Sequence, residues 1–146
     1  MKINIQTPVR QNIEQVWSGF NESLFTQLSP PFPPVNLLRF DGSEKGDEVH
    51  LELNLLIFKQ LWISLITENE KTTEEIYFID EGIKLPFFLS SWKHRHRIVK
   101  AIDEKKQTQS LIIDEIEFES PFGFLIYPAL YLQFLYRRPI YQKIFV

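Results

Sequence analysis

The sequence predicts an α+β fold in which a curved antiparallel sheet of about six to seven strands surrounds a long C-terminal helix, with two short helices near the N-terminus. From Val35 to Phe118, apolar and polar residues alternate in successive short runs, the period of strands with one buried face. The flanking segments 12–28 and 126–145 place apolar residues at helical spacing. Because 146 residues suit one core, we expect a single domain over residues 1–146.

The N-terminal segment predicts a strand followed by two helices. Lys2–Gln6 alternates, and we expect Pro8 to end this first strand. Asn12 with Gln15 three residues later forms a capping-box pattern, which indicates a helix start. Asn21 is placed to cap a second short helix.

The middle of the chain predicts antiparallel strands separated by turns. We read Asp80-Glu81-Gly82 as a turn that ends the fifth strand. The connection Ile83–Leu89 is unusually apolar for a loop, so we expect it to cover apolar surface. The expected strands are Asn36–Phe40, a run that turns Val49, Leu51, Leu53 and Leu55 inward, Gln60–Thr67, Glu74–Ile79, Ser91–Ile102 and Thr108–Phe118.

The last two strands are expected to form a hairpin with a loop over Asp103–Gln107. The corresponding register sets Arg95 opposite Glu115 on one face. It sets His96 directly opposite Asp114 on the other face, and one register that satisfies both faces is internally consistent.

The inward face of the first hairpin strand carries Trp92, His94 and His96, where plain hydrophobic residues are the norm. The imidazoles can close a structural polar patch with Asp114, or anchor the polar end of a ligand. A metal site is the third interpretation, but His50 is expected to point outward, which leaves no third ligand. We therefore predict no metal and no cofactor.

Composition excludes several functions. The net charge of -3, without a run of like charges, predicts no nucleic-acid partner. The chain has no cysteine and no signal-peptide core, which predicts a cytoplasmic location. No nucleophile motif or glycine-rich phosphate loop is present in the sequence. The 13 Phe, 5 Tyr and 3 Trp suit a large core or the lining of an incompletely filled space.

The C-terminal segment is the most apolar part of the chain. Pro121–Tyr136 falls short of the ~20 apolar residues of a spanning helix, so we read it as a buried helix and keep a membrane-surface role as an alternative. Arg137-Arg138-Pro139 indicates a kink or an early stop. Its aromatic residues, Tyr127, Tyr131, Phe134 and Tyr136, are expected in the core.

Several motifs resemble the SRPBCC superfamily, which comprises START-related lipid-transfer domains, aromatase/cyclases and birch-pollen-allergen-like helix-grip proteins. They are Phe78-Ile79-Asp80-Glu81, Leu85-Pro86-Phe87, Trp92-Lys93-His94-Arg95-His96, Asp114, Ser120-Pro121-Phe122-Gly123 and Phe134-Leu135-Tyr136-Arg137. The resemblance implies a cavity between the sheet and the terminal helix. It places the mouth at Pro30–Pro34, Leu56–Gln60, Ile83–Phe88 and the start of the last helix near Phe122.

We therefore expect a binding protein, for transport, storage or sensing, whose partner is a hydrophobic small molecule such as a lipid-like or polyaromatic compound. One alternative is a polyketide cyclase- or dehydratase-like enzyme that uses His96 with Asp114. A second is a non-catalytic membrane-surface or protein-interaction module that uses the C-terminal helix. The expected ligand-binding residues are Trp92, His94, His96, Asp114, Leu53, Phe78, Phe87, Phe88, Phe122, Leu130 and Phe134.

Overall fold

The computed structural model describes residues 1–105 and 107–146. Lys106, in the predicted hairpin loop, lies outside the described residues. The elements are β1 (Lys2–Val9), α1 (Ile13–Ser18), α2 (Glu22–Leu28), β2 (Val35–Phe40), β3 (Glu48–Asn54), β4 (Lys59–Lys71), β5 (Glu75–Lys84), β6 (Ser91–Lys100), β7 (Ser110–Glu119), α3 (Gly123–Leu135) and α4 (Arg137–Ile144).

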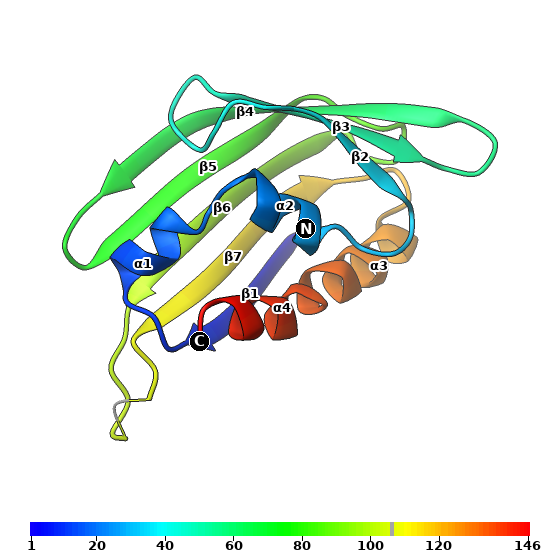
Figure 1. Ribbon diagram of the computed structural model, residues 1–146. Coiled ribbons are helices and arrows are strands. Elements are labelled where there is room, and N and C mark those ends of the chain that lie inside the picture. The colour runs from blue at the N-terminus through cyan, green and yellow to red at the C-terminus, as the bar shows by residue number, and fades with distance from the viewer. Residues whose placement is uncertain (106) are drawn as a thin grey trace.

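The strands form one antiparallel sheet in the order β1-β7-β6-β5-β4-β3-β2. The sheet curves strongly, and α3 and α4 continue from β7 beneath its concave side (Figure 1). This arrangement confirms the predicted α+β fold with a curved sheet, two short N-terminal helices and a long C-terminal helical segment.

The N-terminal elements form where the sequence predicts them, with one correction. The capping box is present, since the Asn12 side chain accepts from the Gln15 backbone N at 2.9 Å and the Gln15 side chain accepts from the Asn12 backbone N at 3.0 Å. Asn21 caps α2 through the Leu24 backbone N at 3.0 Å. Pro8 does not end β1, because β1 is an edge strand, where the missing proline N–H breaks no ladder.

The register of β6 and β7 is the predicted one, with Arg95 opposite Glu115 and His96 opposite Asp114. The outward ion pairs nevertheless differ from a simple opposite pairing. Arg97 reaches Glu115 at 2.6 Å and Glu75 on β5 at 2.5 Å, so one guanidinium ties three strands together. Long side chains reach diagonal neighbours across a sheet, which explains the change of partner.

β5 is longer than predicted and runs through the residues read as a turn. Gly82 lies inside the strand, and a Cβ added there would collide with the Leu85 side chain. The glycine therefore serves close packing rather than a turn. As a result the inward alternation continues from Phe78 to Asp80, and Asp80 is buried.

The helices pack on one face of the sheet in two groups. α1, α2 and α4 cover a cluster that includes Val16, Leu24, Phe78, Ile112 and Tyr141. α3 covers a second cluster centred on a different part of the same face, with the members Ile3, Ile5, Leu89, Trp92, Ile116, Phe118, Leu130 and Phe134. Along β6, the inward histidines lie between Trp92, which belongs to the second cluster, and Ile98, which belongs to the first.

The break between α3 and α4 at Tyr136 confirms the predicted kink, but the predicted burial of the segment is wrong. Only Leu130 and Phe134 of α3 are buried, whereas Tyr127, Tyr131 and Tyr136 are 37%, 38% and 43% exposed. A helix that is apolar all round can turn only one face to the sheet, so its other faces meet solvent. Within the described ranges, none of the helices has the length and apolar character needed to cross a bilayer.

Candidate functional site

The candidate site is a buried polar cluster on the concave face of the sheet. β6 turns Trp92, His94 and His96 inward, and all three are buried. Asp80 from β5 and Asp114 from β7 flank them on either side and are buried as well. Two imidazoles and two carboxylates in an apolar interior require specific partners, because an unpaired buried charge is costly.

Each histidine bonds a carboxylate on its diagonal rather than the one directly opposite. His94 Nε2 lies 2.8 Å from Asp114 Oδ1, and His96 Nε2 lies 2.5 Å from Asp80 Oδ2. The Trp92 indole N–H donates to the other oxygen of Asp80 at 3.0 Å. The predicted pairing of His96 with Asp114 is therefore wrong as a side-chain contact, although their backbone positions are opposite. In the cyclase- or dehydratase-like alternative, the carboxylate that bonds His96 would therefore be Asp80 and not Asp114.

Asp80 is the site residue that the sequence reasoning missed. Ending the fifth strand at Ile79 removed Asp80 from the inward face. The alternation of Ile76 and Phe78 continues to Asp80, and this signal was sufficient to place the carboxylate inside.

The electrostatics of the cluster favour ionised carboxylates beside a neutral imidazole. Burial, together with the charge of His94, lowers the pKa of His96 to about 4. Burial alone would raise the pKa of Asp80, but its hydrogen bonds from His96 and Trp92 help to lower the pKa below its ordinary value. Burial likewise opposes ionisation of Asp114, while the bond to His94 and the charge of Arg137 lower its pKa.

Aromatic rings enclose the two imidazoles. The His94 and His96 rings stack on one another with centroids 3.5 Å apart, and Phe78 stacks on His96 at 4.1 Å. Phe134 of α3 meets His94 edge-on at 5.1 Å. The Arg137 guanidinium lies over the Phe134 ring and 3.8 Å from Asp114 Oδ1. The kink between α3 and α4 thus places the positive side chain of Arg137 beside Asp114.

An apolar wall extends from this cluster across the outer strands. Leu37, Leu51 and Trp62 lie directly opposite one another on β2, β3 and β4, and each is only half-buried. Trp62 packs edge-on against Trp92 at 4.8 Å, which places the row on the concave face. The Trp62 indole nitrogen is buried and has no hydrogen-bond partner among the described residues. We call the row Leu37, Leu51 and Trp62 the concave wall.

Three of the four predicted mouth loops meet at one end of the sheet. The Phe87 ring lies 5.7 Å from Phe58 and 6.2 Å from Phe122, and it packs edge-on against Phe88. Phe87 is 57% exposed, so the cluster presents aromatic surface to solvent. Phe32 of the proline-rich loop is also exposed, but it contacts none of these rings in the described structure.

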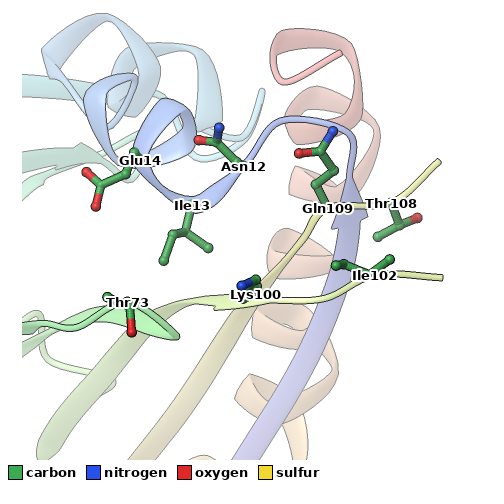
Figure 2. A pocket seen from close by; sticks show the side chains of 8 residues that line it. All are labelled: Asn12, Ile13, Glu14, Thr73, Lys100, Ile102, Thr108 and Gln109. Carbon is green, nitrogen blue, oxygen red and sulfur yellow. The ribbon is translucent and has the colours of Figure 1, made fainter. Parts of the chain in front are cut away.

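Two of the hollows on the surface of the described residues are lined by residues other than the histidines. One, of about 480 Å³, lies at the far end from the aromatic loops, between the first turn of α1 and the β6–β7 connection. Figure 2 shows Ile13, Thr73 and Ile102 around it. The other, of about 240 Å³, includes Trp92 and Glu117 near the chain start.

The predicted ligand-binding residues fall into two groups. Eight are buried, and all except Leu53 of β3 belong to the polar cluster or to the two apolar clusters beside it. These are Trp92, His94, His96, Asp114, Leu53, Phe78, Leu130 and Phe134. The other three belong to the aromatic loops, where Phe87 and Phe122 are exposed and Phe88 is half-buried. Their role in binding stays a prediction.

Comparison with solved structures identifies the architecture. The major latex-like protein 151 of Panax ginseng superposes with a TM-score of 0.60 and 16% identity, covering 97% of this chain and 95% of that one. This chain has the helix-grip fold that these solved structures share. Norcoclaurine synthase from Thalictrum flavum gives a TM-score of 0.60 at 11% identity over 88% of this chain and 76% of that one. For the Zhui aromatase/cyclase from a Streptomyces species, the TM-score is 0.50 at 15% identity over 85% and 72%. No family model and no curated protein sequence matches the chain.

Proposed function

We propose that this protein binds a hydrophobic small molecule between the concave wall and α3, with entry at the aromatic loops. The observation that carries the proposal is that Leu37, Leu51 and Trp62, in a row on the concave face, are only half-buried. Concave apolar surface with a few directed polar groups is the usual composition of a small-molecule site.

The wall supplies affinity through burial. At about 25 cal/mol per Å² of apolar surface, a ligand that buries about 200 Å² gains about 5 kcal/mol before ordering costs. α3 is suited to adjust around a ligand, because only two of its 13 residues are buried. Moving α3 therefore disrupts little packing.

One polar anchor is available at the wall. The unpartnered indole N–H of Trp62 is a buried donor, and leaving such a group unpaired costs roughly 1–3 kcal/mol. A ligand carbonyl or carboxylate oxygen that accepts this hydrogen removes that cost. The buried cluster of His94, His96 and Asp80 lies beyond Trp92 and extends the polar end of the proposed site.

The test is a fluorescence titration with pyrene and with pyrenebutanoic acid, a plain and a polar-headed probe of the same ring system. We expect saturable binding of both. Leu51→Glu should weaken both at least tenfold because it places a charge on the wall. Trp62→Phe and His96→Ala should weaken the acid more than pyrene.

The matched control is Ile102→Glu, which adds the same charge to an exposed residue of the hollow in Figure 2. Affinity for both probes should stay within twofold. Loss of binding in this variant but not in Leu51→Glu would assign the probe to that hollow and refute the proposed site. Failure of both probes to saturate would refute the proposed function itself.

A second candidate function is attachment to a membrane surface through α3, and the exposure of this helix favours it. Phe124, Leu125 and Leu132 are 83%, 60% and 64% exposed. Apolar surface of this kind commonly marks an interaction site. Co-sedimentation with phosphatidylcholine vesicles should fall when Phe124 and Leu132 are both changed to Ser. Unchanged co-sedimentation, or a dimer in solution that these changes dissociate, would contradict membrane attachment.

A further inference from the structure

We propose that Asp80, His94 and His96 form a binding site for one divalent transition-metal ion such as Zn²⁺. The three side chains each present a ligating atom, and these atoms lie within 4.8 Å of one another. Two of the residues come from β6 and one from its neighbour β5, so the sheet itself holds the donors in place. This inference does not depend on binding of a hydrophobic molecule.

The donor set suits the ion. Imidazole nitrogen and carboxylate oxygen bind Zn²⁺ at about 2.0–2.2 Å, which puts tetrahedral ligand atoms about 3.3 Å apart. His96 Nε2 and Asp80 Oδ2 are 2.5 Å apart, and His94 Nδ1 and Asp80 Oδ2 are 3.7 Å apart. Changes of less than about 1 Å bring these two separations to that value, and the ligating atoms of His94 and His96 lie within 4.8 Å of one another.

The surrounding contacts fix which atom of each side chain is available to an ion. His94 bonds Asp114 through Nε2, which leaves Nδ1 facing Asp80 and gives the carboxylate–histidine arrangement that metal-ligating histidines favour. The Trp92 N–H occupies Asp80 Oδ1, so Oδ2, which His96 Nε2 contacts, is the oxygen left to bind the ion. Aromatic rings fix the imidazole planes, with Phe78 against His96 and Phe134 against His94.

Charge also favours a cation here. Metal ligation requires neutral imidazoles, and the remaining charged groups are Asp80, Asp114 and the Arg137 guanidinium 3.8 Å from Asp114. Two carboxylates outnumber one guanidinium, so the cluster attracts a positive ion. Binding transfers the His96 ring proton to Nδ1, a buried nitrogen that has no hydrogen-bond partner in the described structure. Three protein ligands leave at least one position for a non-protein ligand.

The experiment uses the untagged full chain, stripped with a chelator and titrated with Co²⁺ while visible absorption is recorded. We expect one equivalent to bind with the strong d–d bands of a four- or five-coordinate site, and Zn²⁺ to displace it. Because the site is buried, Co²⁺ could enter the folded protein slowly, so the titration is repeated on protein refolded in the presence of Co²⁺. Absence of stoichiometric binding in both preparations would overturn the proposal.

Variants assign the site. Asp80→Asn and His94→Gln, which preserve side-chain size, should each weaken Co²⁺ binding at least 100-fold, and circular dichroism checks that they fold. Asp114→Asn should weaken it about 10–100-fold, as changes of orienting partners do. His50→Gln is the matched control, because His50 bonds Glu48 on the outer side of β3, and it should bind as the parent does. Loss of binding in His50→Gln with retention in Asp80→Asn would place the ion on the surface and refute this site.

Discussion

The crossed pairing of histidines and carboxylates predicts which pairs are energetically coupled. His96 should couple more strongly to Asp80, its hydrogen-bond partner, than to Asp114, which lies directly opposite it on β7. The perturbation is a pair of double-mutant cycles, one combining His96→Leu with Asp80→Ala and the other combining His96→Leu with Asp114→Ala. Leucine keeps much of the imidazole volume without a polar atom.

The magnitude follows from the contacts. A hydrogen bond to a charged group contributes about 1.5–3 kcal/mol, so the coupling of His96 with Asp80 should fall in that range. The coupling of His96 with Asp114 should be smaller than that range, because these two side chains share no hydrogen bond in the described structure and interact through charge and through their common neighbour His94. Each single change should cost roughly 2–4 kcal/mol, which most domains of about 5–15 kcal/mol total stability tolerate.

The assay is urea unfolding at pH 7 with a chelator present, followed by circular dichroism and tryptophan fluorescence. If the two probes report the same transition, unfolding is two-state and the free energies of unfolding can be used in the cycles. A coupling of His96 with Asp114 equal to or above that with Asp80 would refute the crossed arrangement.

Two further outcomes are expected on the outer face of the sheet. Arg97→Met should lower the free energy of unfolding by about 1 kcal/mol, because the partly buried guanidinium joins Glu75 and Glu115. A change in the urea midpoint equivalent to less than about 0.3 kcal/mol would contradict this role. The hydrogen bond from Arg39 lowers the pKa of Asp41, so this carboxylate stabilises the fold above its ordinary pKa and loses that contribution as the pH falls below it. Carboxyl NMR should show the Asp41 pKa rising toward its ordinary value in Arg39→Met, and an unchanged pKa would contradict the assignment.

The sequence was informative where local chemistry decides structure. The capping residues Asn12 and Asn21 predicted the helix starts, and the single register that satisfied Arg95 and His96 predicted the β6–β7 pairing. Both signals act between near neighbours in sequence or across the connection between two consecutive strands. They do not depend on the rest of the fold.

Errors arose where tertiary context decides. Gly82 was interpreted as a turn residue, but it is required by the packing of Leu85, and this hid the inward position of Asp80. The register located Asp114 opposite His96 correctly but did not reveal which diagonal each side chain takes. The apolar composition of α3 indicated burial, whereas the fold offers it contact along only one face.

The most direct test of the proposed function is a crystal structure of the protein with pyrenebutanoic acid. We expect electron density for the pyrene ring between α3 and the concave wall of Leu37, Leu51 and Trp62, with a carboxylate oxygen accepting from the Trp62 indole N–H. Density for the probe only at the hollow near Ile102, with the concave wall unoccupied, would contradict it.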